Sequence, residues 1–514
     1  MTLRRSSLDY LGFVVLAIWS AQLHLTLYSY AFDDAYIHLR VAEQYVETGQ
    51  PYYNPGEAVM ASSSPGWVVL LALLSVVFDD TVRVVAVLNA VVTVAGALVF
   101  MRLLGLLTDG AAGKIARWSY GFCYLSILHF SSVGLMETSL AVLLLGTAIL
   151  LFRAGSPAGF LPFGALPFFR PELVVFTAAF LAYNLFRPKV RSAVALALAA
   201  VGALPFVGFQ LYYFGTIVPH TVSAKSAVYA LSMRESLVLL VDAAQQLFVL
   251  LFVEGVGIAV GLVLALLAAS AIYKEAKDRG AVREDGGAVN LLLGGGALVA
   301  LGYVSMRAVV FPWYVPLFAV PISFSVFGIV ARWRSPLAWT GLGVFTALTL
   351  GVALAGSTVA SFGPTERYLF FASNARVRKY LEVGARLYER FPDATLMSSE
   401  IGGLGHAFKG RIVDGVGLVS PEALKHHPMK VPEQRSRGYL GAIPAAFVEE
   451  SRPELVASLE IFVEEFGRSP VSREYVRIQE PIYVDEDRRP AGPRALWGSR
   501  HLNVYVRRDL LDTN

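Results

Sequence analysis

Residues 10–34 read YLGFVVLAIWSAQLHLTLYSYAFDD, an apolar run that stops just before two adjacent carboxylates, Asp33 and Asp34. A membrane-spanning helix needs about 20 mostly apolar residues, and this run has that length. The basic residues Arg4 and Arg5 precede the run, and no small-residue cleavage site of the signal-peptide kind follows it. We therefore expect an uncleaved transmembrane anchor whose N-terminus lies in the cytoplasm.

The whole chain has the composition of an integral membrane protein. Of its 514 residues, 55% are hydrophobic and 16% are charged, whereas soluble domains usually have about a quarter charged residues. The apolar content excludes intrinsic disorder. The single cysteine, Cys123, excludes an internal disulfide framework and a thiolate-clustered metal site. The basic residues are dispersed and the net charge is only +4, so the pattern is not that of a nucleic-acid-binding protein.

Further apolar runs indicate many more spans. They are long and continuous rather than alternating, which favours transmembrane helices over a barrel. The candidate spans after the first lie at 82–106, 116–132, 137–152, 158–169, 172–186, 192–210, 247–272, 288–306, 309–331 and 337–358. The predicted fold class is thus a polytopic α-helical membrane protein with about eleven transmembrane helices.

The positions of the basic residues test this count, because Lys and Arg in short loops stay in the cytoplasm. With the N-terminus inside, every even-numbered crossing should end beside basic residues. The basic clusters lie at the ends of the even-numbered crossings only if residues 158–186 form a hairpin of two short helices and not one tilted span. The resulting topology places residues 31–81, residues 211–246 and the C-terminal segment outside the membrane. The clusters that meet this condition are Lys114 with Arg117, Arg153, Arg187 with Lys189 and Arg191, Lys274 to Arg283, and Arg332 with Arg334.

A soluble C-terminal domain is expected after the spans. Residues 1–360 form the predicted transmembrane domain. Residues 361–514 form a predicted extracytoplasmic α/β domain, because charged residues become frequent there and the apolar stretches shorten. Strand-length apolar stretches lie at 394–397, 411–413 and 503–507, and helical periodicity at 375–390 and 454–465.

The first outer loop, residues 31–81, contains the most informative polar residues. An apolar repeat at helical spacing follows the two carboxylates, and Gly-Gln-Pro at 49–51 ends that helix. Either Asp33 or Asp34 could be the N-cap of the helix. A second carboxylate beside a bilayer is costly unless it is paired or faces a polar cavity. We therefore expect a functional role for the pair.

A second helix is expected later in the same loop. Ser62-Ser63-Ser64-Pro65 opens it, with serine as the cap and proline in the first turn. The apolar run at 66–78 is too short to cross the membrane. We expect this helix to lie in the outer interface.

The order of these motifs resembles the first extracytoplasmic loop of the GT-C membrane glycosyltransferases. It is most similar to the branch that contains the mycobacterial terminal arabinofuranosyltransferase. Two departures, Ser62-Ser63-Ser64 in place of Gly-Tyr-Thr and an inserted Met136, leave the identity of the sugar open. The matching segments are Asp33-Asp34-Ala35-Tyr36-Ile37, Asn54-Pro55-Gly56-Glu57, Ser63-Ser64-Pro65-Gly66-Trp67, Gly134-Leu135-Met136-Glu137-Thr138 and Arg170-Pro171-Glu172, with weaker matches at 212–225 and 402–417.

The resemblance implies a glycosyltransferase that takes a sugar from a polyprenyl-phosphate donor. The acceptor would be a glycan, lipid or protein on the outer face of the cytoplasmic (inner) membrane. One of the two carboxylates, Asp33 or Asp34, would be the general base of an inverting displacement. The candidate cations for the lipid phosphate are Arg170, Lys225 and Arg307. The candidate substrate-binding or supporting residues are Tyr36, His38, Arg40, Asn54, Glu57, Ser64, Trp67, Glu137, Glu172 and His220.

Some of these residues also have plain structural interpretations. Arg170 and Glu172 could form a buried ion pair at a turn stiffened by proline, and Trp313 with Tyr314 fits an interfacial aromatic belt. The glycine cluster at 402–405 lacks the full dinucleotide fingerprint, so no nucleotide site is expected. No cofactor or dedicated metal site is expected either, and a divalent cation beside the carboxylates stays open.

Two other classes of function fit the same sequence. A transporter or flippase would also have many spans, but the chain shows no paired halves with matching hydropathy. A non-catalytic receptor or assembly factor would use the outer domain and would not need the carboxylates of the first loop. The enzyme hypothesis requires Asp33, Asp34, Glu137 and Arg170 to converge on one cavity at the outer face.

Overall fold

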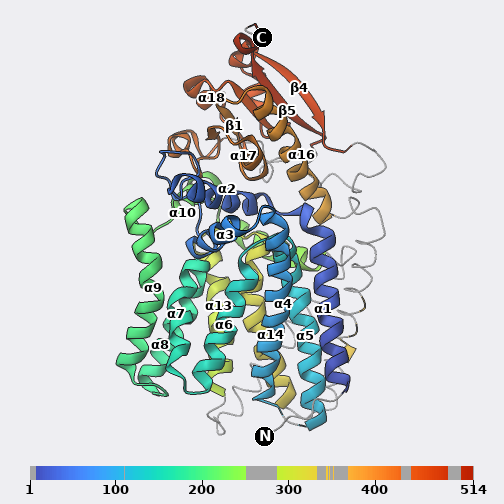
Figure 1. Cartoon of the computed structure of the whole chain (residues 1–514), viewed down its shortest axis with the longest axis vertical. Coiled ribbons are helices and arrows are strands. Elements are labelled where there is room, and N and C mark those ends of the chain that lie inside the picture. The colour runs from blue at the N-terminus through green and yellow to red at the C-terminus, as the bar shows by residue number, and fades with distance from the viewer. Residues whose placement is uncertain are drawn as a thin grey trace.

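The computed structural model describes residues 7–108, 110–249, 286–332, 369–429, 441–483 and 499–512, together with positions 343, 344, 347 and 351. Figure 1 shows a bundle of helices that run along the length of the molecule, with shorter helices across one end of the bundle. A small domain that contains a β-sheet lies beyond those shorter helices. The described chain is therefore mostly helical, with its sheet confined to the C-terminal part.

The bundle contains the apolar helices of the chain. Each expected span within the described ranges overlaps one of them. Four segments, Asp9–Tyr30, Thr81–Gly105, Ser192–Phe214 and Gly287–Ser305, are long and apolar enough to cross a membrane. These helices suggest a membrane protein, and the count of eleven crossings stays a prediction. The helices of the bundle are α1 (Ser7–Leu27), α4 (Thr81–Gly105), α5 (Gly110–Val133), α6 (Thr138–Arg153), α7 (Phe160–Phe169), α8 (Val174–Phe186), α9 (Ser192–Phe214), α13 (Gly286–Ser305) and α14 (Pro316–Arg332).

Some predictions concern residues that the structure does not describe. Most of the expected spans at 247–272 and 337–358 lies outside the described residues. The same is true of the basic cluster from Lys274 to Arg283, of Arg334, and of the expected domain boundary after residue 360.

The chain reverses direction at Arg170, as the expected hairpin requires. The helices α7 and α8 flank a short 3-10 turn at Pro171–Leu173. The rings of Phe163 and Phe180 stack with their centroids 4.8 Å apart. The Thr177 hydroxyl donates a hydrogen bond of 2.6 Å to the Phe163 carbonyl oxygen. Two short antiparallel helices are therefore present, and Arg170 lies at their shared tip.

The two helices of the first loop, α2 (Asp33–Thr48) and α3 (Pro65–Val77), lie across one end of the bundle (Figure 1). The helix α2 ends at Gly49, whose φ of 73° is left-handed and favours a residue without a Cβ atom. The helix α3 has its proline in the first turn, as expected. Both predicted helices are confirmed.

The predicted cap of α2 is wrong, whereas the predicted serine cap of α3 is confirmed in position. Phe32 is the N-cap of α2, so Asp33 and Asp34 already belong to the first turn and neither caps the helix. Ser64 is the N-cap residue of α3, as expected, but its side chain makes no capping hydrogen bond. Its hydroxyl instead donates a hydrogen bond of 3.1 Å to the Glu137 carboxylate. A capping hydroxyl would accept a backbone N–H of the first turn, whereas here the hydroxyl donates to a buried carboxylate in a charge-assisted hydrogen bond.

The C-terminal domain has a five-stranded mixed sheet in the order β2-β1-β3-β5-β4. The strand β1 pairs in parallel with β2 and β3, and β5 pairs antiparallel with β3 and β4. In the parallel register, Leu396 lies opposite Ile412 on one side and Leu455 on the other. The elements are β1 (Leu396–Ser398), β2 (Ile412–Asp414), β3 (Leu455–Leu459), β4 (Tyr475–Pro481), β5 (His501–Arg507), α16 (Leu369–Arg390), α17 (Gly402–Phe408), α18 (Ala445–Ser451), α19 (Glu464–Arg468) and α20 (Arg508–Asp512).

The expected helix at 454–465 is wrong, because Leu455–Leu459 forms the strand β3. All 5 residues of this strand are buried, since it lies between β1 and β5. A strand that is buried on both faces has apolar residues at successive positions and loses its two-residue period. The edge strand β4 was not predicted, because its residues, most of them exposed, mix polar and apolar types and show no apolar stretch.

Candidate functional site

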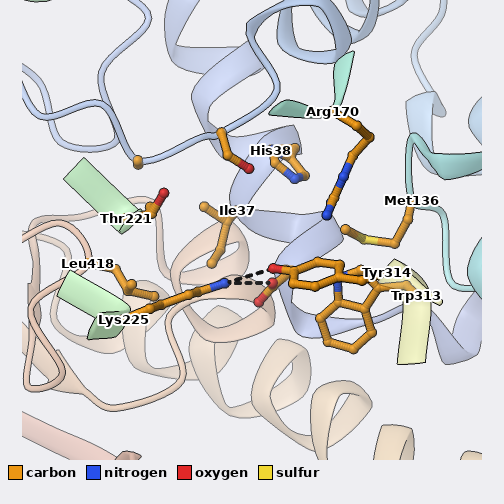
Figure 2. A pocket seen from close by; sticks show the side chains of 12 residues that line it. Ile37, His38, Met136, Arg170, Thr221, Lys225, Trp313, Tyr314 and Leu418 are labelled. Carbon is orange, nitrogen blue, oxygen red and sulfur yellow. Dashed lines mark hydrogen bonds and ion pairs between the residues drawn. The ribbon is translucent and has the colours of Figure 1, made fainter. Parts of the chain in front are cut away.

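A pocket lies where α2 and α10 (His220–Tyr229) meet the turn before α14 and a loop of the C-terminal domain. The space between its walls that no atom fills is about 370 Å³, and this figure includes solvent at its open mouth. Figure 2 shows Lys225 entering from one side and Arg170 with His38 from another, with Tyr314 between them. Segments from seven parts of the chain thus form one site. The lining residues are Asp34, Ile37, His38, Ala61, Ser63, Met136, Arg170, Thr221, Lys225, Trp313, Tyr314 and Leu418.

Asp34 and Lys225 form an ion pair inside this pocket. The distance from Lys225 Nζ to Asp34 Oδ2 is 3.7 Å, and their side chains are 25% and 27% exposed. The ammonium also donates a hydrogen bond of 3.2 Å to the Tyr314 hydroxyl and lies 4.9 Å from the centroid of the Phe311 ring. A carboxylate and an ammonium are therefore accessible side by side to a molecule in the pocket.

Arg170 is neutralised by two carboxylates behind the pocket wall. Its Nη1 donates to Glu137 at 2.8 Å, and its Nη2 and Nε donate to Glu172 at 2.8 and 3.2 Å. The guanidinium carbon lies 4.2 Å from the centroid of the Tyr314 ring, and Tyr303 donates to Glu172 at 2.6 Å. Three of the five N–H donors of Arg170 are thus bound to carboxylates. Its 3% exposed side chain is mainly a rigid support.

His38 connects the pocket to the same carboxylates. Its Nδ1 lies 2.9 Å from the Ser62 hydroxyl, which also accepts the Ser64 backbone N–H at 3.0 Å. Its Nε2 lies 3.8 Å from Glu137 Oε2. Burial lowers the pKa of His38, although Glu137 and Asp34 act in the opposite direction, so the ring is neutral near pH 7. One arrangement of protons satisfies these groups. The Ser62 hydroxyl donates to Nδ1 of His38, and the N–H at Nε2 faces the Glu137 carboxylate.

Asp33 lies outside the pocket wall and binds the C-terminal domain. Its two carboxylate oxygens accept the backbone N–H groups of Gly402 and Gly403, each at 2.9 Å. A Cβ atom at position 402 would lie 1.8 Å from the Asp33 carbonyl oxygen, so this approach requires glycine. The two adjacent carboxylates therefore have different surroundings, and Asp34 is the one that reaches the pocket. The expected convergence of four residues on one cavity is met only in part: Asp34 and Arg170 line the pocket, Glu137 binds Arg170 without lining it, and Asp33 does not line it.

The position of Asp33 also explains the glycine cluster at 402–405. The strands β2 and β3 lie on opposite sides of β1, so the carboxyl end of β1 is the switch point of the parallel part of the sheet. Ligands of α/β domains bind at such a point, often on backbone amides that open a helix. Here the first two amides of α17 bind the carboxylate of Asp33. The glycine cluster thus accommodates an anionic group of the same chain.

Two further predicted residues, Arg40 and Asn54, bind the backbone of the C-terminal domain. Arg40 donates to the Gly410 carbonyl oxygen at 2.6 Å and to the Tyr53 carbonyl oxygen at 2.9 Å. Asn54 donates to the Ile412 carbonyl oxygen at 2.8 Å and accepts the Ile412 N–H at 3.1 Å. These bonds satisfy buried backbone groups beside β2. Both residues are therefore structural anchors between the first loop and the C-terminal domain.

Glu57 and Tyr36 belong to the same contact between loop and domain. Glu57 accepts a hydrogen bond of 2.8 Å from Arg411. The Tyr36 ring lies 5.2 Å from the His406 ring, measured between centroids. Neither residue is part of the pocket wall.

The remaining predicted residues lie away from the pocket or at its edge. His220 Nε2 is 3.0 Å from the Gly417 carbonyl oxygen, which fixes a loop of the C-terminal domain next to α10. Trp67 is completely buried in the hydrophobic core. Arg307 is exposed and does not line the pocket.

The pocket also contains residues that sequence reasoning did not assign to a site. Trp313 and Tyr314 were expected only as an aromatic belt, but both lie on the pocket wall. These two residues are far in the sequence from the other residues of the pocket, so sequence spacing could not show that they lie beside them. Leu418 comes from the C-terminal domain, and a single leucine in a loop carries no functional signal.

The described residues contain no group of three or more His, Cys, Asp or Glu side chains placed to hold a metal ion. A search of protein-family models and of curated proteins found no match to this sequence. The function is therefore argued from the chemistry of the pocket.

The role of Asp33 predicts a specific pH dependence. Burial and then Glu400 raise the pKa of Asp33 from 3.8 to about 7, while Arg376 and the two amides act in the opposite direction. A raised pKa means that the folded protein binds the proton more tightly than the unfolded chain does. The stability that Asp33 contributes should be fully present below pH 3.8 and be lost as the pH rises through about 7.

Thermal unfolding of the wild type and of Asp33→Asn between pH 4 and pH 8 measures this contribution. The wild type should lose more stability than the variant as the pH rises. Identical pH profiles would contradict the prediction. Asp414 has a pKa that burial raises to about 6, and its effect cancels because it is present in both proteins.

Proposed function

We propose that this protein is an integral-membrane glycosyltransferase that transfers a sugar from a polyprenyl phosphate to an acceptor hydroxyl. The observation that carries the proposal is the pair of Asp34 and Lys225, which face one pocket at the end of a bundle of apolar helices. The pair provides a proton acceptor and a cation within 3.7 Å of each other. Transfer between a phosphate and a hydroxyl needs both groups.

Each group has one role in the reaction. The acceptor oxygen attacks the anomeric carbon of the sugar, and the bond between that carbon and the phosphate oxygen breaks. The lipid phosphate leaves with the bonding electron pair, and the acceptor proton moves to the Asp34 carboxylate. One displacement inverts the configuration at the anomeric carbon.

Lys225 is the cation that holds the departing phosphate. The Lys225 side chain is 25% exposed, whereas the Arg170 side chain is 3% exposed and is already bound to Glu137 and Glu172. The indole N–H of Trp313, in the pocket wall, has no hydrogen-bond partner among the described residues. An oxygen of the sugar or of the phosphate would satisfy this donor.

The proposal includes a location for the protein. The N-terminus lies in the cytoplasm, the chain crosses the cytoplasmic membrane about eleven times, and the C-terminal domain lies on the outer face. The acceptor is a glycan, lipid or protein on that face. Lys and Arg in the short loops at the far end of the bundle support this orientation.

The position of the pocket distinguishes the proposal from a transporter. Secondary transporters bind their substrates near the middle of the membrane, between two repeats. Here the pocket lies among α2, α10 and the C-terminal domain, at one end of the bundle (Figure 1). A receptor that used only the outer domain would have no need of the ion pair in the pocket.

An assay with defined lipid donors tests the proposed function. The purified protein is incubated with polyprenyl phosphates that carry different sugars and with simple acceptor glycosides, and the products are identified by mass. At least one donor should yield a glycosylated acceptor together with free polyprenyl phosphate. Lys225→Met should lower this yield strongly, while Lys425→Met, an exposed lysine of the C-terminal domain, should not. Absence of a product with every donor would contradict the proposal.

A further inference from the structure

We infer that the phosphate of the donor displaces Asp34 from Lys225, so that binding of the donor releases the base. This inference rests on the proposed function and adds an order of events to it. The carboxylate is held by the lysine in the empty pocket and becomes available for the acceptor proton only after the phosphate takes its place.

The contact between Asp34 and Lys225 is the exchangeable one in the pocket. At 3.7 Å it is longer than a hydrogen bond, and about a quarter of each side chain is exposed. It is the one ion pair that either residue makes in the described part of the chain. An ion pair that is partly exposed contributes little net free energy. A second anion can therefore compete with the carboxylate.

The other cation of the pocket is not available for exchange. Arg170 is buried and bound by Glu137 at 2.8 Å and by Glu172 at 2.8 Å. To remove it from these partners would leave buried carboxylates without a counter-charge. An incoming phosphate therefore finds its cation in Lys225.

The ammonium keeps its position when Asp34 leaves. Its hydrogen bond to the Tyr314 hydroxyl is 3.2 Å long, and the Phe311 ring lies 4.9 Å away. The face of an aromatic ring attracts a cation. These contacts do not depend on Asp34, so the phosphate meets an ammonium that is already oriented.

The exchange has a consequence for the chemistry. While Asp34 faces the ammonium, the carboxylate is paired with Lys225 and not with an acceptor hydroxyl. Once the phosphate neutralises Lys225, the carboxylate can accept a hydrogen bond from the acceptor. The order of binding is then donor first and acceptor second.

The inference predicts that loss of the carboxylate strengthens the binding of the phosphate. The probe is a polyprenyl methyl phosphodiester, which has the charge of the donor but no sugar to transfer, and its dissociation constant is measured in detergent. Asp34→Asn should bind the probe about 3- to 10-fold more tightly than the wild type, because the competing anion is absent. Lys225→Met should bind it at least about 10-fold more weakly.

The double variant and a matched control complete the experiment. Asp34→Asn combined with Lys225→Met should bind as weakly as Lys225→Met alone, because the carboxylate competes only through the lysine. Asp79→Asn makes the same change at an exposed position outside the pocket and should bind as the wild type does. Asp34→Ser repeats the measurement, and thermal unfolding curves show that each variant is folded.

The outcomes separate this inference from the proposed function. If Asp34→Asn and Asp34→Ser bind the probe no better than the wild type while Lys225→Met binds it weakly, the exchange is overturned and the transferase proposal stands. If the wild type does not bind the probe, the donor assignment is overturned as well. Tighter binding by both Asp34 variants, abolished by Lys225→Met, supports the exchange.

Discussion

Replacement of Asp34 by asparagine is expected to lower sugar transfer by about 10²- to 10⁴-fold, which is the usual contribution of a general base. Asparagine has nearly the same shape as aspartate, so the pocket wall is kept and only the proton acceptor is lost. The measurement is the rate of product formation at saturating donor and acceptor. The loss should appear in kcat, while the donor KM should not rise, because the phosphate is held by Lys225.

Asp33→Asn is the control for this prediction, because the two carboxylates are neighbours in the sequence. Asp33 accepts the amides of Gly402 and Gly403 at 2.9 Å and is not part of the pocket wall. Its variant should weaken the contact with the C-terminal domain and still transfer sugar at a rate within about 10-fold of the wild type. A variant Asp34→Asn with full activity, or a larger loss in Asp33→Asn, would contradict the assignment of the base to Asp34.

Replacement of Arg170 by methionine should destabilise the protein by about 3–5 kcal/mol, because it breaks a buried charge network by removing one partner. Glu137 has no exposed surface and would lose its cation, and Glu172 would lose two hydrogen bonds. The measurement is the unfolding midpoint in detergent. A fall of several degrees is expected.

Two comparisons identify the cause of this loss. Arg307→Met removes an exposed arginine that lies outside the pocket wall, and it should leave the unfolding midpoint nearly unchanged. Glu137→Gln and Glu172→Gln, added to Arg170→Met, should restore part of the stability because no buried charge is then left alone. If Arg170→Met unfolds at the midpoint of the wild type, Arg170 is not the structural support described above.

Most of the helical framework could be predicted from the sequence. Apolar runs of span length and the breakers between them are local properties, so the helices at 82–106 and 192–210 appear close to where they were expected. The hairpin at 158–186 followed from the positions of basic residues. The strand β3 could not be predicted, because residues 455–459 are buried throughout and lack the alternation of apolar and polar residues that marks a strand with one exposed face.

The candidate site could be predicted only in part. The sequence indicated that Asp34, Arg170 and Lys225 were chemically suitable, and the structure places all three around one pocket. It also indicated residues such as Arg40 and Asn54, whose polar groups turn out to bind the backbone of the C-terminal domain. The sequence gives only the type of a polar residue, and the same type can bind a buried backbone group or a ligand.

The sequence by itself determined the helical framework, the first loop with its two carboxylates and the presence of a C-terminal α/β domain. Only the tertiary structure decided which of Asp33 and Asp34 contacts the C-terminal domain and which faces the pocket. The physical reason is that successive side chains of a helix point about 100° apart. One carboxylate therefore meets the amides of α17, and the next meets the ammonium of Lys225 in the pocket.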